Sequence, residues 1–162
     1  MKKSILLIAI FISGFDSSPL APDYDFLYQN DAASFQQGIN ALSKLTDGKI
    51  HLSLDAKKDV PGVFSDVKGV ELHHFSGPHP AGNVGIQIHK INPLNKGDLV
   101  WTINPLGVIM IGRLFEKGIL DPEINLAVTG SEIIDPQYYK TIIGANIQPI
   151  LHKKISNKNP RI

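Results

Sequence analysis

The residues best suited to chemistry lie in a loop after the first apolar run. Phe15–Phe26 reads FDSSPLAPDYDF and contains three aspartates, two serines and two prolines. Ligands of open α/β sheets bind at the carboxyl ends of strands, so a strand before this loop would place it beside a ligand. Asp16, Ser17 and Ser18 could then accept hydrogen bonds from ribityl, ribose or quinone-linked groups. The same side chains could instead cap turns and helices, and the residues leave both roles open.

The histidines are the next candidates, as metal ligands. His73, His74, His79 and His89 lie close together in the sequence. Neighbouring strand residues point to opposite faces, so His73 and His74 cannot both reach one metal without distortion. With no cysteine or carboxylate pair nearby to complete a ligand set, we predict no metal site. The chain has no cysteine, which excludes disulfides, thiolate nucleophiles and cysteine-ligated zinc or iron–sulfur clusters. No serine–histidine–acid order is recognisable, so no catalytic residue is predicted.

A glycine-rich stretch, GPHPAGNVG (Gly77–Gly85), is a third candidate. Free backbone amides there could receive an anion, although the stretch matches neither GxGxxG nor a P-loop. A packing role for Gly82 and Gly85 fits equally well. If the chain binds a flavin or nucleotide, His79 and Asn83 would face the Asp16 loop from this stretch.

These residues need elements to position them, and the periodicity predicts strands that alternate with helices. Such alternation is typical of an α/β fold, a Rossmann-like, mostly parallel sheet with helices on both faces. The segment after Pro80 fits a helix or a strand, and we favour the helix because proline suits a first helical turn. The predicted strands are 4–13, 49–54, 70–75, 98–103 and 123–130, and the predicted helices are 31–46, 80–91 and 105–117.

The last thirty or so residues differ in character from the rest of the chain. After Gly130 the sequence predicts short strands and turns with no clear helix. We therefore predict a Rossmann-like domain at residues 1–131 and the start of a small β-rich module at 132–162. From Thr141 to Ile162 there is no acidic residue, while Lys153, Lys154, Lys158 and Arg161 are basic. We interpret this segment as a solvated tail, with a partner or an anionic lipid surface as the alternative.

The charge balance and the N-terminus limit the function further. Sixteen basic and fifteen acidic residues give a net charge of +1, so no nucleic-acid partner is predicted. MKK followed by ILLIAIFI has the form of a signal peptide and is too short for a membrane span. Its β-branched residues suit a buried central strand equally well.

Several phrases, in collinear order over essentially the whole chain, resemble one family, the A subunit of the sodium-translocating NADH:quinone reductase. They are AIFISGFDSSPLAPDYDF, GINALSKLTDGKI, FSGPHPAGNVGIQIHKINP, VWTINPLGVIMIGRLFEKG, LAVTGSEI and GANI. The family's chains are much longer, so the resemblance implies an internal piece, in which Ile5–Ser13 is a strand rather than a signal.

The resemblance implies a peripheral subunit on the cytoplasmic face of the bacterial inner membrane. Its partners would be the other subunits of a complex that oxidises NADH, reduces quinone and exports sodium ions. That complex uses FAD, FMN and an iron–sulfur centre, which the resemblance places in other subunits. Membrane contact would come only through the complex, and quinone would be a further partner of this subunit.

The resemblance also extends to relatives that bind flavin and NADH, the C subunit of the Rnf complex and the flavoprotein subunit of complex I. Their acidic E-x-E-P loop corresponds here to Phe15–Pro19, where Asp16 and the proline are kept and Ser18 replaces a carboxylate. Residues after Gly130 resemble the opening of a β-grasp, SLBB-like module.

We therefore expect a quinone-interacting or scaffolding domain that has no chemistry of its own and binds no cofactor. The alternative is a domain that keeps the relatives' flavin or nucleotide crevice. The predicted crevice residues are Phe15, Asp16, Ser17, Ser18, His79 and Asn83.

Overall fold

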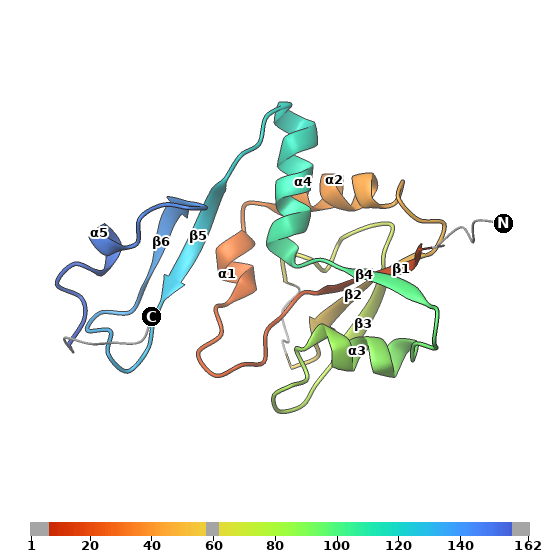
Figure 1. The fold of residues 1–162 in the computed structure, drawn as a ribbon, viewed down its shortest axis with the longest axis horizontal. Coiled ribbons are helices and arrows are strands. Elements are labelled where there is room, and N and C mark those ends of the chain that lie inside the picture. Colours follow the sequence, from red (N-terminus) through yellow and green to blue (C-terminus); the bar gives the residue numbers. More distant parts are fainter. Residues whose placement is uncertain (1–6, 58–61, 157–162) are drawn as a thin grey trace. The chain divides into compact units, whose positions relative to one another are not determined.

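The computed structural model describes residues 7–57 and 62–156 (Figure 1). Its Cα packing divides the chain into two compact units, Met1–Asp121 and Pro122–Ile162. No helix in the described ranges is long and apolar enough to cross a membrane.

The first unit is built on a four-stranded sheet in the order β3-β2-β1-β4, with every neighbouring pair parallel. This confirms the predicted α/β fold with a mostly parallel sheet. The strand order reverses between β1 and β4, so the crevice expected at such a point lies at their carboxyl ends. The strands are β1 (Leu7–Ser13), β2 (Lys49–Asp55), β3 (Glu71–Phe75) and β4 (Leu99–Thr102).

Strand β1 is the apolar run that also resembles a signal peptide. It lies between β2 and β4, and its residues from Ala9 to Ile12 are buried. A strand enclosed by neighbours and covered on both faces is expected to be apolar along its whole length. Residues 1–6, which begin the signal-like pattern, are outside the described ranges.

Two helices, α2 (Ala32–Leu42) and α4 (Pro105–Lys117), cover one face of the sheet (Figure 1). The bounds of α4 confirm the prediction, because Asn104 caps its start and Gly118 ends it with a φ of 70°. The predicted α2 was too long at its C-terminal end, where Leu45 lies beyond the helix and is exposed.

Close packing of these two helices depends on glycine. A Cβ atom at Gly112 would lie 1.7 Å from the carbonyl oxygen of Ser34, and one at Gly38 would lie 2.1 Å from that of Val108. Neither position has space for a larger residue, so the helix backbones approach each other directly. The core on this face is apolar and includes Ile10, Ile12, Phe35, Ile39, Leu52, Phe64, Val108 and Ile109.

The opposite face is covered by α3 (Val84–Ile91), where Ile88 packs on Ala9 and Phe11 (Figure 1). The preference for a helix over a strand here is confirmed. The helix begins later than Pro80, however, because the Asn83 side chain accepts a hydrogen bond from the Gly85 amide and caps it.

A short helix, α1 (Tyr24–Tyr28), lies inside the segment predicted as a loop. Asp23 caps it by accepting a hydrogen bond from the Asp25 amide. Its five residues are too few to show helical periodicity, which is why the pattern did not reveal it.

The second unit contains an antiparallel pair, β5 (Glu123–Val128) and β6 (Gln137–Ile142), and a short helix α5 (Gln148–Leu151). The β5 strand was predicted as part of the first domain, but it pairs with β6 and groups with the second unit. Helix α5 was not predicted.

The basic segment is partly folded rather than a free tail. Ile155 forms a β-bridge with Ile133, and the Lys154 ammonium group hydrogen-bonds the Tyr139 hydroxyl and lies 4.8 Å from its ring centroid. Two of the four basic residues of this segment, Lys158 and Arg161, are outside the described residues.

Candidate functional site

A crevice of about 540 Å³ opens where the strand order reverses, at the carboxyl ends of β1 and β4. The loop after β1, the approach to α3 and the start of α4 surround it. All the predicted crevice residues except Ser17 line it. The lining residues are Ser13, Phe15, Asp16, Ser18, Tyr24, His79, Gly82, Asn83, Val84, Thr102, Ile103 and Asn104.

Ser17 holds together the two loops that form the crevice. Its hydroxyl oxygen accepts a hydrogen bond from the Gly82 amide at 2.8 Å and lies 3.2 Å from Nδ1 of His79. A Cβ atom at Gly82 would lie 2.5 Å from the Ser17 backbone nitrogen, so only glycine permits this approach. The structure thus gives Gly82 the packing role that the sequence left open.

Several polar groups at the mouth of the crevice already form hydrogen bonds within the chain. Asp16 Oδ1 accepts a hydrogen bond from the Ser18 amide at 2.8 Å. Asn83 Oδ1 accepts one from the Gly85 amide, and Asn104 Oδ1 accepts one from the Gly107 amide, each at 2.8 Å. At the start of each of these two helices, an asparagine side chain therefore already binds one of the backbone amides that could otherwise bind an anion.

Tyr24 is a crevice residue that sequence reasoning missed. Burial, followed by the negative charge of Asp16, raises the pKa of the Tyr24 hydroxyl. Like any tyrosine hydroxyl it is protonated at neutral pH and can donate a hydrogen bond. Tyr24 is part of the loop that the sequence singled out, but helix α1, which orients it, left no periodic signal.

Gln87 of α3 supports the crevice from behind and is fully buried. Its Nε2 donates hydrogen bonds to Ser13 Oγ at 2.8 Å and to the Ala81 carbonyl at 3.1 Å. Its Oε1 has no hydrogen-bond partner among the described residues. The side chain thus ties α3 to the end of β1 and fixes the position of the crevice wall.

A second pocket, of about 510 Å³, lies on the other side of the loop after β1. It shares Phe15, Asp16 and Tyr24 with the crevice. Its other lining residues are Gly14, Ala21, Pro22, Asp23, Asp25, Leu54, Asp55, Gly62, Phe64, Ser65 and His74. All three aspartates of the loop thus line the second pocket, and Asp16 also lines the crevice.

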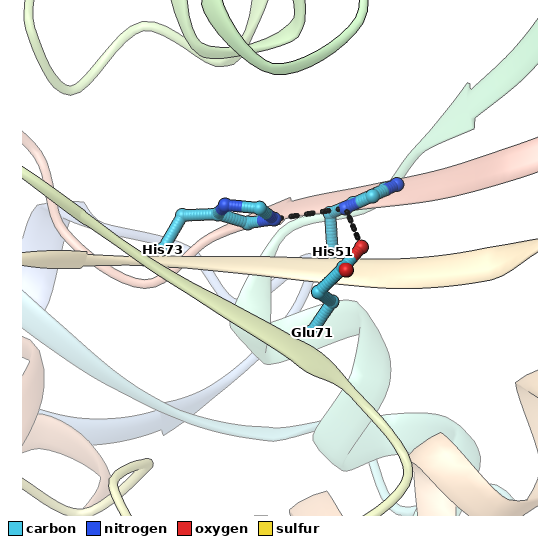
Figure 2. Close-up of side chains that lie close together, drawn as sticks. All are labelled: His51, Glu71 and His73. Carbon is cyan, nitrogen blue, oxygen red and sulfur yellow. Dashed lines mark hydrogen bonds and ion pairs between the residues drawn. The ribbon is translucent and has the colours of Figure 1, made fainter.

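A polar cluster away from the crevice joins β2 and β3 (Figure 2). Nδ1 of His51 lies 2.9 Å from Nε2 of His73 and 3.2 Å from Oε2 of Glu71. Burial, and then the charge of His73, lower the pKa of His51, while Glu71 acts in the opposite direction. A hydrogen bond from Lys49 is the main cause that lowers the pKa of Glu71.

Sequence reasoning missed this cluster because it grouped histidines that are close in the chain. The opposite orientation expected for His73 and His74 is confirmed, since His73 joins the cluster and His74 lines the second pocket. His51 lies twenty-two positions before His73. The alternation in KIHLSLD and ELHHF shows which residues of each strand share a face. It does not show which residue of one strand lies beside which residue of the other.

Comparison with known proteins supports the resemblance seen in the sequence. The family model described as "NqrA second alpha/beta domain" matches residues 7–120, and the model described as "NQRA C-terminal domain" matches residues 126–162.

Curated relatives point to the same family. The A subunit of the Na(+)-translocating NADH-quinone reductase of Neisseria meningitidis serogroup B is 39% identical over 154 residues, which is 95% of this chain and 34% of the relative. The proteins of the same name from Pasteurella multocida and from Yersinia pestis are 32% and 35% identical, over 96% and 95% of this chain and 34% of each relative. The chain thus spans about a third of the length of these relatives. Because the first family model covers most of the sequence, the chain belongs to the NqrA family, the A subunits of the Na(+)-translocating NADH-quinone reductases.

Proposed function

We propose that this chain is part of the A subunit of a sodium-translocating NADH:quinone reductase, in which its crevice accepts a quinone head group. The subunit would lie on the cytoplasmic face of the membrane and work with the other subunits of the complex. Flavins and the iron–sulfur centre would be carried by those subunits, and this domain would supply a binding surface. Membership of the family supports the assignment to the complex.

The chemistry of the crevice is the observation that carries the quinone assignment. A quinone head group is flat and uncharged and has carbonyl oxygens that accept hydrogen bonds. The crevice offers the aromatic ring of Phe15, the protonated hydroxyl of Tyr24 and the imidazole of His79. These groups provide an aromatic surface and hydrogen-bond donors, which are the features such a ligand needs.

The alternative is that the crevice binds a flavin or a nucleotide. Both of these ligands in their usual cofactor forms carry phosphate, which binds at helix N-termini with free amides. Here Asn83 and Asn104 already accept hydrogen bonds at the starts of α3 and α4. The Asp16 carboxylate at the same crevice would also repel a phosphate group. These features favour an uncharged ligand.

Titration of the isotope-labelled 162-residue chain tests the proposal. A water-soluble benzoquinone with a short side chain should shift the amide signals of Phe15, Tyr24 and Asn83. FMN and NADH at equal concentration should leave these signals in place. Addition of NADH and flavin should give no NADH oxidation, since no catalytic residue is assigned to this domain.

Tyr24→Phe is the informative variant, because it removes one hydroxyl and keeps the ring. We expect quinone affinity to fall about fivefold, as for the loss of one neutral hydrogen bond. Tyr28→Phe is the matched control, since Tyr28 lies on the same helix, is buried and does not line the crevice. Shifts caused by FMN but not by quinone would replace the proposal with the flavin alternative. If none of these ligands shifts the amide signals, the proposal is wrong and the scaffolding role is favoured.

A further inference from the structure

We propose that His51, Glu71 and His73 form a binding site for a divalent transition-metal ion with the preferences of Zn²⁺. The three side chains are the group in residues 7–57 and 62–156 whose ligand atoms all lie within 4.8 Å of one another. Two imidazoles and a carboxylate are a ligand set that proteins use for zinc, with a fourth position left for water or another ligand.

Strand pairing creates the site. In the parallel register His51 pairs with Glu71, and Ser53 pairs with His73. Alternate residues of a strand share a face, so His51, Glu71 and His73 all lie on the face of the sheet that α3 covers in part. Strand β3 is at the edge of the sheet, and the Glu71 side chain is 42% exposed. A metal ion could therefore reach the site from solvent.

The spacing of the ligand atoms suits a bound ion (Figure 2). Around a tetrahedral zinc ion with bonds of about 2.0–2.1 Å, ligand atoms lie about 3.3 Å apart. The distances from Nδ1 of His51 to the other two ligand atoms are 2.9 Å and 3.2 Å. The ligand atoms of Glu71 and His73 lie within 4.8 Å of each other, so their side chains would rotate to bring all three atoms to coordination distance.

Hydrogen bonds among the three side chains cannot pair all three facing atoms at once. If His73 donates its Nε2 proton to Nδ1 of His51, the His51 lone pair is used and the Glu71 oxygen faces a nitrogen that has no proton to donate. If Nδ1 of His51 carries the proton, that one proton faces two acceptors. A metal ion accepts electron pairs from all three atoms at once, so it satisfies the cluster where a single proton cannot.

The surroundings hold the ligands in place, as partners outside the coordination sphere do at protein metal sites. The Lys49 ammonium group donates to Oε1 of Glu71 at 2.8 Å, which leaves Oε2 directed at His51. The His51 ring stacks on Phe11 with centroids 4.5 Å apart and planes inclined by 15°. His51 is only 6% exposed, so its ring has little freedom to turn away.

Metal binding to the purified, metal-free 162-residue chain tests the site. Zn²⁺ should bind with a stoichiometry of one, as measured by calorimetry against a competing chelator. Co²⁺ in its place should give the absorption bands of a tetrahedral or five-coordinate ion. His73→Gln and Glu71→Gln should each lower Zn²⁺ affinity at least about tenfold. Both residues are partly exposed, so these variants should keep the fold, which circular dichroism would check.

His74→Gln is the matched control, because His74 is the next residue of β3 and points to the other face of the sheet. It should leave Zn²⁺ affinity unchanged. The proposal is overturned if the wild-type chain binds no stoichiometric Zn²⁺. It is also overturned if His74→Gln weakens binding as much as His73→Gln does, since the ion would then lie among other histidines.

Discussion

The two faces of the four-stranded sheet bury side chains of different chemistry. On the face covered by α2 and α4, the core consists of aliphatic and aromatic residues and the helices meet through Gly38 and Gly112. On the face covered by α3, the buried residues include His51, Ser53 and Gln87. The first face buries apolar groups that stabilise the fold, whereas the second also buries polar groups, of which Gln87 ties α3 to the end of β1.

Substitutions on the two faces should therefore act differently. Changes on the α2–α4 face should lower the free energy of unfolding of the whole unit, because closely packed apolar groups cannot rearrange without a large loss of contacts. Changes on the α3 face should act mostly on local geometry and on binding. Paired substitutions on the two faces test this difference directly.

Gly112→Ala should have the largest effect. Its Cβ atom would lie 1.7 Å from the Ser34 carbonyl oxygen, so α2 and α4 would have to separate. We expect the free energy of unfolding to fall by about 3 kcal/mol or more, as measured by urea denaturation. Gly85→Ala on α3 is the control, since its nearest outside atom would be Asn83 Oδ1 at 3.2 Å. Gly85→Ala should change the free energy of unfolding by no more than about 1 kcal/mol. Equal losses of stability in the two variants would contradict the difference that we infer between the two faces.

Leu52→Ala and Ser53→Ala compare neighbouring buried residues of β2 that point to opposite faces. Leu52 is fully buried in the apolar core, and its truncation should cost about 2–5 kcal/mol. Ser53→Ala should cost about 1 kcal/mol or less. Thermal unfolding of both variants measures the difference. A larger loss for Ser53→Ala would show that the polar face carries more of the stability than we infer.

Alkaline pH should destabilise the core through Tyr28. Burial, together with the charges of Tyr24 and Asp31, raises the pKa of Tyr28 to about 12. The unfolded chain loses this proton near pH 10, so it binds fewer protons than the folded chain between these values. Stability is therefore lost as pH rises through this window, on the order of 2 kcal/mol.

Denaturation curves at pH 9 and pH 11 would measure about half of this loss, because pH 11 is midway between the two pKa values. Tyr28→Phe should remove most of it, because phenylalanine does not titrate. A Tyr28→Phe protein with the same alkaline sensitivity as the wild type would show that another group is responsible.

Ser17→Ala should have the smallest effect. It removes the acceptor of the Gly82 amide, so the two crevice loops should separate more often. The amide hydrogen exchange of Gly82 should speed up by about fivefold, while the free energy of unfolding changes by about 1 kcal/mol or less. Ser18→Ala is the control, since the hydrogen bond between Ser18 and Asp16 comes from the Ser18 backbone amide. Unchanged Gly82 exchange in Ser17→Ala would mean that other contacts hold the loops.

Much of the fold and part of the site could be predicted from local patterns. Helix α4 is marked by Asn104 and Pro105 at its start and Gly118 at its end, and these signals act within one helical turn. The position of the Asp16 loop followed from the rule for ligands of parallel sheets. Five-residue α1 escaped prediction because so short a helix shows no periodicity, and Tyr24 was missed with it.

The sequence by itself determined the strands and the three longer helices of the first unit, and the place of the loop at the end of β1. These features depend on hydrophobic periodicity, caps and turn residues, which are properties of neighbours in the chain. Only the tertiary structure decided that His51 meets Glu71 and His73, that Ser17 contacts Gly82 and that β5 pairs with β6. The register between strands and the approach of loops depend on packing between residues far apart in the sequence, which no local pattern records.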